Sequence, residues 1–214
     1  MFALTPGLHA CIVGESPVLL NEASGRYMLL RGQTARNLHA FLSGASNEEE
    51  NVALLASGLI VRSTHPSVQP PEVPKPVSTY LNAEGARCST TMLIRALAAL
   101  RCARRFIRRH PLRDILAHQR AIHGNRDCAD NSAVALEGTI AATFHVIQRI
   151  LPSTTQCFPR SIAIAALLRN FGCNPTLVIG VQLPISAHCW VQCDDRVIGD
   201  TLDRVTAFQP IWAT

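Results

Sequence analysis

The feature that most constrains this chain is a cluster of prolines in its first third. Five of the 13 prolines fall between Pro66 and Pro76. Proline fixes its own φ and has no N–H to donate, so such a segment neither joins a central strand nor continues a helix. The cluster therefore predicts an extended linker over residues 65–80, which separates a small unit, 1–64, from a larger unit, 81–214.

Composition and charge indicate a folded chain with a local excess of arginine. The 214 residues are 48% hydrophobic and 16% charged, which supports a sizeable core. The net charge is +5, and the arginines concentrate between Arg87 and Arg126. The chain has no run of 18 apolar residues, and no positive charge precedes Arg26. We therefore expect neither a membrane span nor a secretory signal, and a cytoplasmic location.

The cysteines and histidines do not suggest a metal centre. Eight cysteines are present, but none form a C-x-x-C pair, and the eight histidines are scattered along the chain. A disulfide scaffold is typical of shorter, secreted chains. We expect free thiols in a reducing compartment, no metal site and no cofactor.

The order of predicted elements favours the α+β class. The small unit has strand patterns at 9–13, 17–21 and 26–30, the last two forming a hairpin, and then two helices and a closing strand. Ser46 and Glu49 form a candidate capping box for the second helix, which Gly58 ends. In the larger unit, helical patterns come first, near 93–107, 132–151 and 158–171. Strand patterns follow at 176–183, 187–193 and 196–200.

Cys157 is the candidate nucleophile. It lies at the expected start of a helix, with Pro159 suited to the first turn. The helix dipole and the free N–H groups of a first turn favour a thiolate over a thiol. A thiolate nucleophile also requires a base, and the base requires a group that orients it.

His188 and Asp200 are the candidate base and orienting group. They lie on consecutive predicted strands, 12 residues apart. A two-residue turn at Asp194 and Asp195 would place their side chains on opposite faces of the hairpin. A three-residue loop that includes Arg196 would place them diagonally on one face, within hydrogen-bonding reach. The triad hypothesis therefore predicts the longer loop.

These motifs resemble the transglutaminase-like cysteine protease of lasso-peptide biosynthesis, the B protein. The resemblance rests on C-F-P-R-S from Cys157, A-H-C-W-V around His188, and Asp200. The family has Leu, Ala and Glu where this chain has Phe158, Cys189 and Gln192. The segments 17–21, 24–27 and 42–44 are similar to the fused leader-recognition domain of such proteins, with two helices in place of the usual three.

The resemblance implies a fold and a function. It implies a small winged helix-turn-helix-like domain, then the Pro-rich linker, then a transglutaminase/papain-like domain. The function implied is cleavage of a precursor at the leader–core junction by Cys157, His188 and Asp200. The leader would add as a strand near residues 26–30 beside the second helix, and a macrolactam cyclase would be a partner. The implied leader-binding residues are Arg26, Tyr27, Met28, Leu29, Leu30, Val52 and Leu55.

Three other interpretations of the residues remain open. The same triad would serve acyl transfer to an amine, as in transglutaminases, and only the product distinguishes transfer from hydrolysis. The arginine-rich block would suit a nucleic-acid binder. However, Phe106 is the only aromatic residue among the arginines and the small unit carries mixed charge, so we expect no nucleic-acid partner. A non-catalytic peptide-binding module is the third interpretation.

Overall fold

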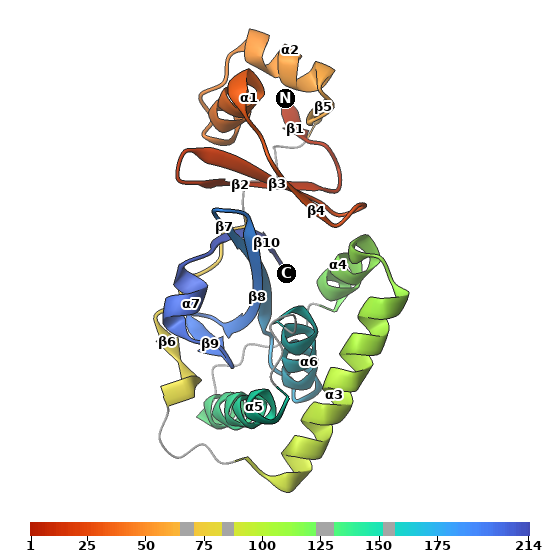
Figure 1. Ribbon diagram of the computed structural model, residues 1–214, viewed down its shortest axis with the longest axis vertical. Coiled ribbons are helices and arrows are strands. Elements are labelled where there is room, and N and C mark those ends of the chain that lie inside the picture. The colour runs from red at the N-terminus through yellow and green to blue at the C-terminus, as the bar shows by residue number, and fades with distance from the viewer. Residues whose placement is uncertain (65–70, 83–87, 123–130, 152–156) are drawn as a thin grey trace.

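The protein consists of a small unit stacked on the end of a larger one (Figure 1). The computed structural model describes residues 1–64, 71–82, 88–122, 131–151 and 157–214. The rest of the chain includes part of the proline cluster, Arg87, Arg126 and Cys128, so the predictions for these residues lie outside the described part. The predicted α+β class is confirmed.

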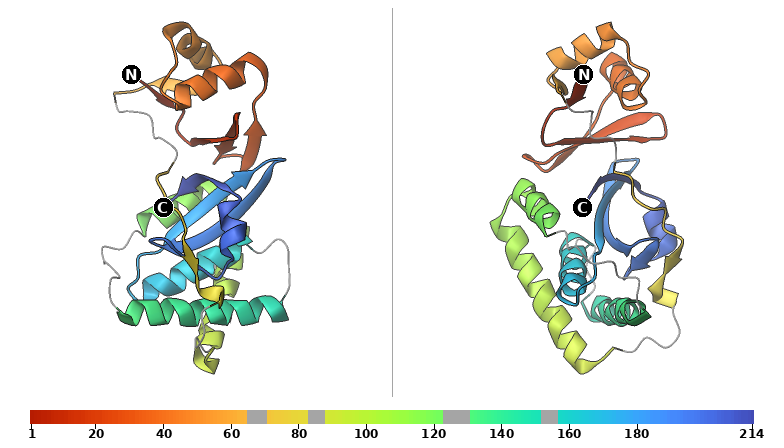
Figure 2. Two further views of the ribbon diagram at one scale, coloured as in Figure 1. Left: turned by 90° about the vertical axis from the view of Figure 1, so that its left-hand side faces the viewer. Right: turned by 180° about the vertical axis from the view of Figure 1, so that it is seen from behind.

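The small unit is built from two antiparallel sheets and two helices. Strands β2 (Leu8–Val13), β3 (Ser16–Asn21) and β4 (Arg26–Leu29) form a sheet in that order, so β4 is an edge strand. Strand β1 (Phe2–Leu4) pairs with β5 (Ile60–Arg62). Helices α1 (Gly32–Leu42) and α2 (Glu48–Ala56) lie together on the far side of the three-stranded sheet from the larger unit (Figure 2). The predicted β3–β4 hairpin is confirmed.

The capping box of α2 lies one residue later than predicted. Asn47, not Ser46, accepts a hydrogen bond from the Glu50 N–H, and the Glu50 carboxylate accepts one from the Asn47 N–H, both at 2.9 Å. Three consecutive glutamates make the sequence pattern degenerate, and Asn is as good an N-cap as Ser. Local preference alone therefore did not determine where this helix begins.

The larger unit contains a five-stranded sheet in the order β10-β7-β8-β9-β6. Strands β7 (Thr176–Gln182), β8 (Ser186–Cys193) and β9 (Arg196–Ile198) agree with the predicted segments, although β9 is shorter. The sequence patterns did not indicate β10 (Gln209–Ala213) or the short helix α7 (Leu202–Thr206). All neighbours are antiparallel except β6 (Ser78–Thr79), which pairs parallel with β9.

Helices α5 (Asn131–Ile150) and α6 (Cys157–Asn170) cover one face of this sheet, and α7 packs on the other. Helix α3 (Thr90–Arg109) packs on α6 and α5, on the side away from the sheet (Figures 1 and 2). Helix α4 (Leu112–Ala121), which the patterns did not predict, follows α3. In the described part of the chain, no helix has both the length and the apolar character needed to cross a bilayer.

The two units share a hydrophobic core. Cys11, Val18 and Leu20 on β2 and β3 are buried in the same cluster as residues of α3, α5, α6 and β7. A polar bridge accompanies this packing, because the Glu22 carboxylate is 2.6 Å from His9 Nε2 and 3.2 Å from Arg120 of α4. The prediction of two units joined by a spacer did not anticipate this contact.

The described part of the Pro-rich segment lies against the sheet of the larger unit. Gln192 of β8 donates a hydrogen bond to the Pro74 carbonyl at 2.9 Å, and the Val77 N–H donates one to the Asp195 carbonyl at 2.9 Å. Ser78 and Thr79, which follow the last proline of the cluster, then supply strand β6. The end of the expected linker is therefore part of the larger unit's sheet.

Candidate active site

Cys157 is the first residue of α6, as the sequence predicted. Its side chain is half-buried, which by itself would raise the thiol pKa. Hydrogen bonds from the His188 side chain and from the N–H groups of Cys189 and Phe158 act in the opposite direction and outweigh burial. The pKa of Cys157 therefore lies below its ordinary value, because these donors favour the thiolate.

The short length of β9 allows α6 to approach the sheet at this point. Strand β9 ends at Ile198, which pairs with Val191, so β9 does not extend alongside Cys189. The first turns of α6 occupy that place, where Ser161 Oγ donates a hydrogen bond to the Cys189 carbonyl at 2.8 Å. The candidate nucleophile is thus held against β8 by bonds to the main chain of the sheet.

His188 lies on β8, in register with Gly180 of β7, and is only 2% exposed. Its Nε2 donates a hydrogen bond to Asp200 Oδ2 at 2.7 Å, which leaves Nδ1 for the thiol of Cys157. Burial alone would lower the pKa of His188. Hydrogen bonds to Asp200 and Cys157 outweigh burial and raise it above its ordinary value.

The turn between β8 and β9 is shorter than the triad hypothesis required. Cys193 pairs with Arg196, so Asp194 and Asp195 alone form the turn, with a positive φ of 53° at Asp194. The predicted three-residue loop is wrong. The longer loop is required only if β9 continues as a regular strand as far as Asp200, and β9 ends at Ile198.

Gly199 explains how Asp200 still reaches His188. The strand ends at Ile198, and Gly199 has a φ of +72°, a conformation that favours glycine. This residue interrupts the alternation of side chains between the two faces. Asp200 therefore turns back towards His188 instead of facing away from it.

The carboxylate of Asp200 accepts hydrogen bonds from three donors. Besides His188, Arg160 Nη2 lies 3.0 Å from Oδ2, and the Thr201 N–H donates to Oδ1 at 3.0 Å. Burial would raise the pKa of Asp200, which is 5% exposed, but these bonds and the positive charges of His188 and Arg160 lower it. The carboxylate is therefore held ionised beside the imidazole.

Aromatic side chains pack around His188. The Trp190 ring lies 6.2 Å from the imidazole and nearly parallel to it, and the Phe208 ring lies 5.2 Å away. These two residues leave no space for a side chain at Gly180, where a Cβ would lie 2.7 Å from the Trp190 ring and 2.9 Å from Phe208. The imidazole is thereby confined to one position and shielded from water.

The lowered pKa of the thiol and the raised pKa of the imidazole act together. Both shifts favour a thiolate–imidazolium pair, which the buried Asp200 carboxylate further stabilises. Such a pair attacks carbonyl carbons and supplies a proton to the leaving group. In the part of the chain that the structure describes, no group of three or more Cys, His, Asp or Glu side chains is arranged to hold a metal ion.

The sequence reasoning missed the contact of Arg160 with Asp200 and that of Phe208 with His188. Arg160 lies three residues after Cys157, which puts both side chains on one face of α6, so helical spacing could have indicated it. No comparable signal marks Phe208, which follows α7 and reaches His188 only through the tertiary fold.

The residues predicted to bind a leader lie on the small unit with differing exposure. Arg26 is exposed, and Val52 on α2 is 56% exposed. Met28, Leu30 and Leu55 pack against the core of the small unit. Tyr27 and Leu29 project from the other face of β4 onto the shared core, where Cys157 and Phe158 also pack.

Tyr27 brings the small unit close to the candidate nucleophile. Burial raises its pKa, and negative charge on the Cys157 thiolate raises it further. Tyr27 and Cys157 also pack against the same hydrophobic core. Strand β4 of the small unit therefore borders the core against which the candidate nucleophile packs.

Comparison with known proteins agrees with this geometry. The family model described as Transglutaminase-like superfamily matches residues 96–213, more than half of the chain, and this range includes Cys157, His188 and Asp200. This superfamily usually has Cys-His-Asp catalysis with protease or transferase activity. No curated protein and no solved structure matches the chain.

Proposed function

Because the chain belongs to the transglutaminase-like superfamily, we propose that it is a cysteine peptidase that removes the leader from a ribosomally made lasso-peptide precursor. Cys157 is the nucleophile, His188 the general base and acid, and Asp200 the group that orients the imidazole. The observation that carries this proposal is that Tyr27, on an edge strand of the small unit, packs against the same core as Cys157.

The hydrolysis proceeds in two steps. The Cys157 thiolate attacks the carbonyl carbon at the leader–core junction, and the Cys157 N–H, at the start of α6, stabilises the oxyanion. The imidazolium of His188 gives its proton to the departing amine, which frees the core and leaves the leader as a thioester. His188 then takes a proton from water, which attacks the thioester, releases the leader as a carboxylic acid and restores the thiolate.

The small unit recognises the leader in this proposal. In the described residues no strand pairs with the outer edge of β4, so its main-chain groups can bind a further strand. A peptide added there passes Tyr27 and comes close to Cys157. Arg26–Leu30, Val52 and Leu55 are the proposed contacts. Residues 1–64 are the proposed leader-recognition domain and 81–214 the proposed protease domain. Residues 65–80 are the proposed linker, whose end supplies strand β6 to the sheet of the protease domain.

The freed core requires a further enzyme. Cleavage produces a new amino terminus, which a macrolactam cyclase would join to a side-chain carboxyl group. We propose this cyclase as a partner and the cytoplasm, where precursors are synthesised, as the location.

The test follows the mass of the precursor peptide encoded beside the gene. Wild-type protein, with purified cyclase present in a parallel reaction, should release the leader with a gain of one water across the two products. Cys157→Ala should release none, whereas Cys88→Ala, which changes a thiol far along the chain from the candidate site, should act as wild type. Cleavage by Cys157→Ala would refute the assignment of the nucleophile. A product joined to an added amine, without hydrolysis, would indicate acyl transfer.

Leader binding has a separate test. Val52→Asp changes an exposed apolar side chain among the proposed leader contacts, and Val134→Asp changes an exposed valine on α5. Val52→Asp should weaken binding of a labelled leader peptide in fluorescence anisotropy, and Val134→Asp should not. Equal affinity of both variants and wild type would contradict the proposed position of the leader.

A further inference from the structure

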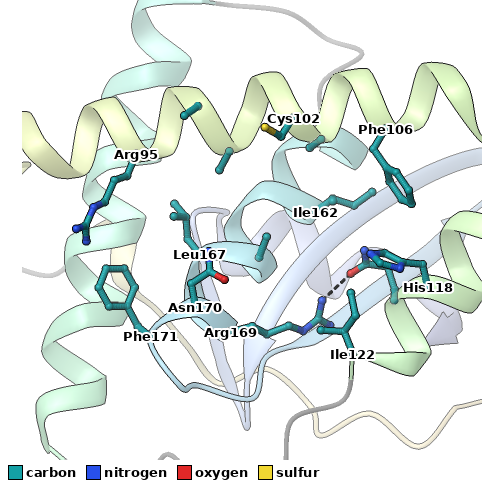
Figure 3. Close-up of a pocket in the computed structure, with 15 residues that line it drawn as sticks. Arg95, Cys102, Phe106, His118, Ile122, Ile162, Leu167, Arg169, Asn170 and Phe171 are labelled. Atoms are coloured by element: carbon teal, nitrogen blue, oxygen red, sulfur yellow. Dashed lines mark hydrogen bonds between the residues drawn. The ribbon is translucent and has the colours of Figure 1, made fainter.

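A cavity lies away from the candidate catalytic residues. It is bounded by α3, α4 and the carboxyl-terminal half of α6, and has a volume of about 610 Å³ (Figure 3). Cys157 begins α6, and Arg169, which lines the cavity, lies near its other end. At 1.5 Å per residue these positions are about 18 Å apart along the helix. The cavity is therefore a separate site, of a size that suits a small ligand.

Most of the cavity wall is apolar. The small side chains of alanines on α3 and α6 leave room for the cavity, and larger apolar side chains border it (Figure 3). The principal apolar residues are Ala99, Ala103, Phe106, Ile162, Leu167 and Phe171. A ligand with an apolar body would bury its surface here.

Arg169 supplies an unsatisfied cation at one side of this apolar space. Its Nη1 donates a hydrogen bond to Gln119 Oε1 at 2.7 Å, the contact drawn in Figure 3. Its Nε and Nη2 are buried and have no hydrogen-bond partner. These two nitrogens are adjacent, and their N–H bonds point in parallel from one edge of the guanidinium. A carboxylate matches that edge with both of its oxygens.

The charges around the cavity also favour an anion. The lining residues include Arg95 and His118 besides Arg169, and none is acidic. Helices α3 and α6 contain no Asp or Glu at all. Burial without a counter-charge lowers the pKa of Arg169. A bound anion would therefore offset the free-energy cost of burying the charged guanidinium.

We propose that this cavity binds a carboxylate carried on an apolar body, with both oxygens on Nε and Nη2 of Arg169. Ile122 also lines the cavity, and because its side chain is 38% exposed it can turn aside to admit the ligand. Two sources offer this chemistry: a free medium-chain carboxylic acid, and the carboxyl terminus of a peptide that ends in an apolar residue. The inference does not depend on the proposed peptidase activity.

Calorimetric titration of the full-length protein tests the proposal. Octanoate is compared with octanol, and the tetrapeptide Gly-Gly-Leu-Phe with its carboxyl-terminal amide. At least one acid should bind, and its neutral counterpart should bind about 10- to 100-fold more weakly, because a charge-assisted hydrogen-bond pair is lost. Which acid binds more tightly identifies the source of the carboxylate.

Variants test the position of the ligand. Arg169→Gln should weaken binding of the acid by the same factor, and Ala99→Phe should abolish its binding by filling the cavity. Arg149→Gln, which changes an exposed arginine of α5, should bind as wild type. Thermal unfolding without ligand checks each variant, and if Arg169→Gln does not fold, Ala99→Phe and the acid–neutral comparison decide. Failure of both acids to bind, equal binding of acid and neutral forms, or unchanged binding by a folded Arg169→Gln would overturn the proposal.

Discussion

Replacing Asp200 with Asn should make Cys157 less reactive at neutral pH. Asp200 and His188 are 5% and 2% exposed, so water cannot replace the carboxylate that accepts the Nε2–H bond at 2.7 Å. Asn has the same shape but no charge to stabilise the imidazolium, so the pair reverts towards neutral thiol and imidazole. A hydrogen bond to a charged group contributes about 1.5–3 kcal/mol. The thiolate population should therefore fall about 10- to 100-fold, since about 1.4 kcal/mol corresponds to a factor of ten.

The assay is alkylation by iodoacetamide between pH 5 and 9, with the modified cysteine identified by peptide mapping. Wild-type Cys157 should react at pH values where ordinary thiols do not, because its pKa is lowered. Asp200→Asn should react more slowly and require higher pH. Asp203→Asn, which changes an exposed carboxylate three residues away, should match wild type. A wild-type rate and pH dependence in Asp200→Asn would refute the electrostatic role of Asp200.

Three further results are expected. Gly199→Ala should destabilise the protein by about 1–3 kcal/mol in urea unfolding and slow Cys157 alkylation, because a φ of +72° disfavours alanine and its Cβ would lie 3.0 Å from Ile164 Cδ1. Gly180→Ala should reduce the free energy of unfolding by a comparable amount and therefore lower Tm, since its Cβ would meet the Trp190 ring at 2.7 Å. An unchanged Tm would contradict this packing. The pKa of Asp200 is lowered in the folded state, so its contribution to stability is present above its ordinary pKa of 3.8 and is lost as pH falls through the folded value. The difference in unfolding free energy between wild type and Asp200→Asn should therefore shrink below pH 3.8 in urea titrations.

The activity that we propose adds a pH dependence of its own. Acid should abolish cleavage by protonating the Cys157 thiolate, and alkali should abolish it by deprotonating the His188 imidazolium. The lowered pKa of Cys157 extends the pH range of activity towards acid, and the raised pKa of His188 extends it towards alkali.

The sequence alone determined the local structure around the candidate catalytic residues. The start of α6 at Cys157 and the strand that carries His188 follow from helix-start signals and strand patterns within a few residues. Such signals reflect local dihedral preferences and side-chain periodicity, which do not need the rest of the chain. They erred by one residue at the α2 cap, where Asn47 and Ser46 are nearly equivalent in local terms.

Only the tertiary structure decided which of these pieces meet. Gly199 places Asp200 against His188 despite a tight hairpin, and no residue pattern specified how far β9 continues. Tyr27 lies 130 positions before Cys157, and the cavity at Arg169 exists because α3 and α4 pack against α6. Contacts over such separations depend on which apolar faces are buried together. The physical reason is that many sequences share one pattern of local preferences, whereas close packing of a complete core selects one arrangement.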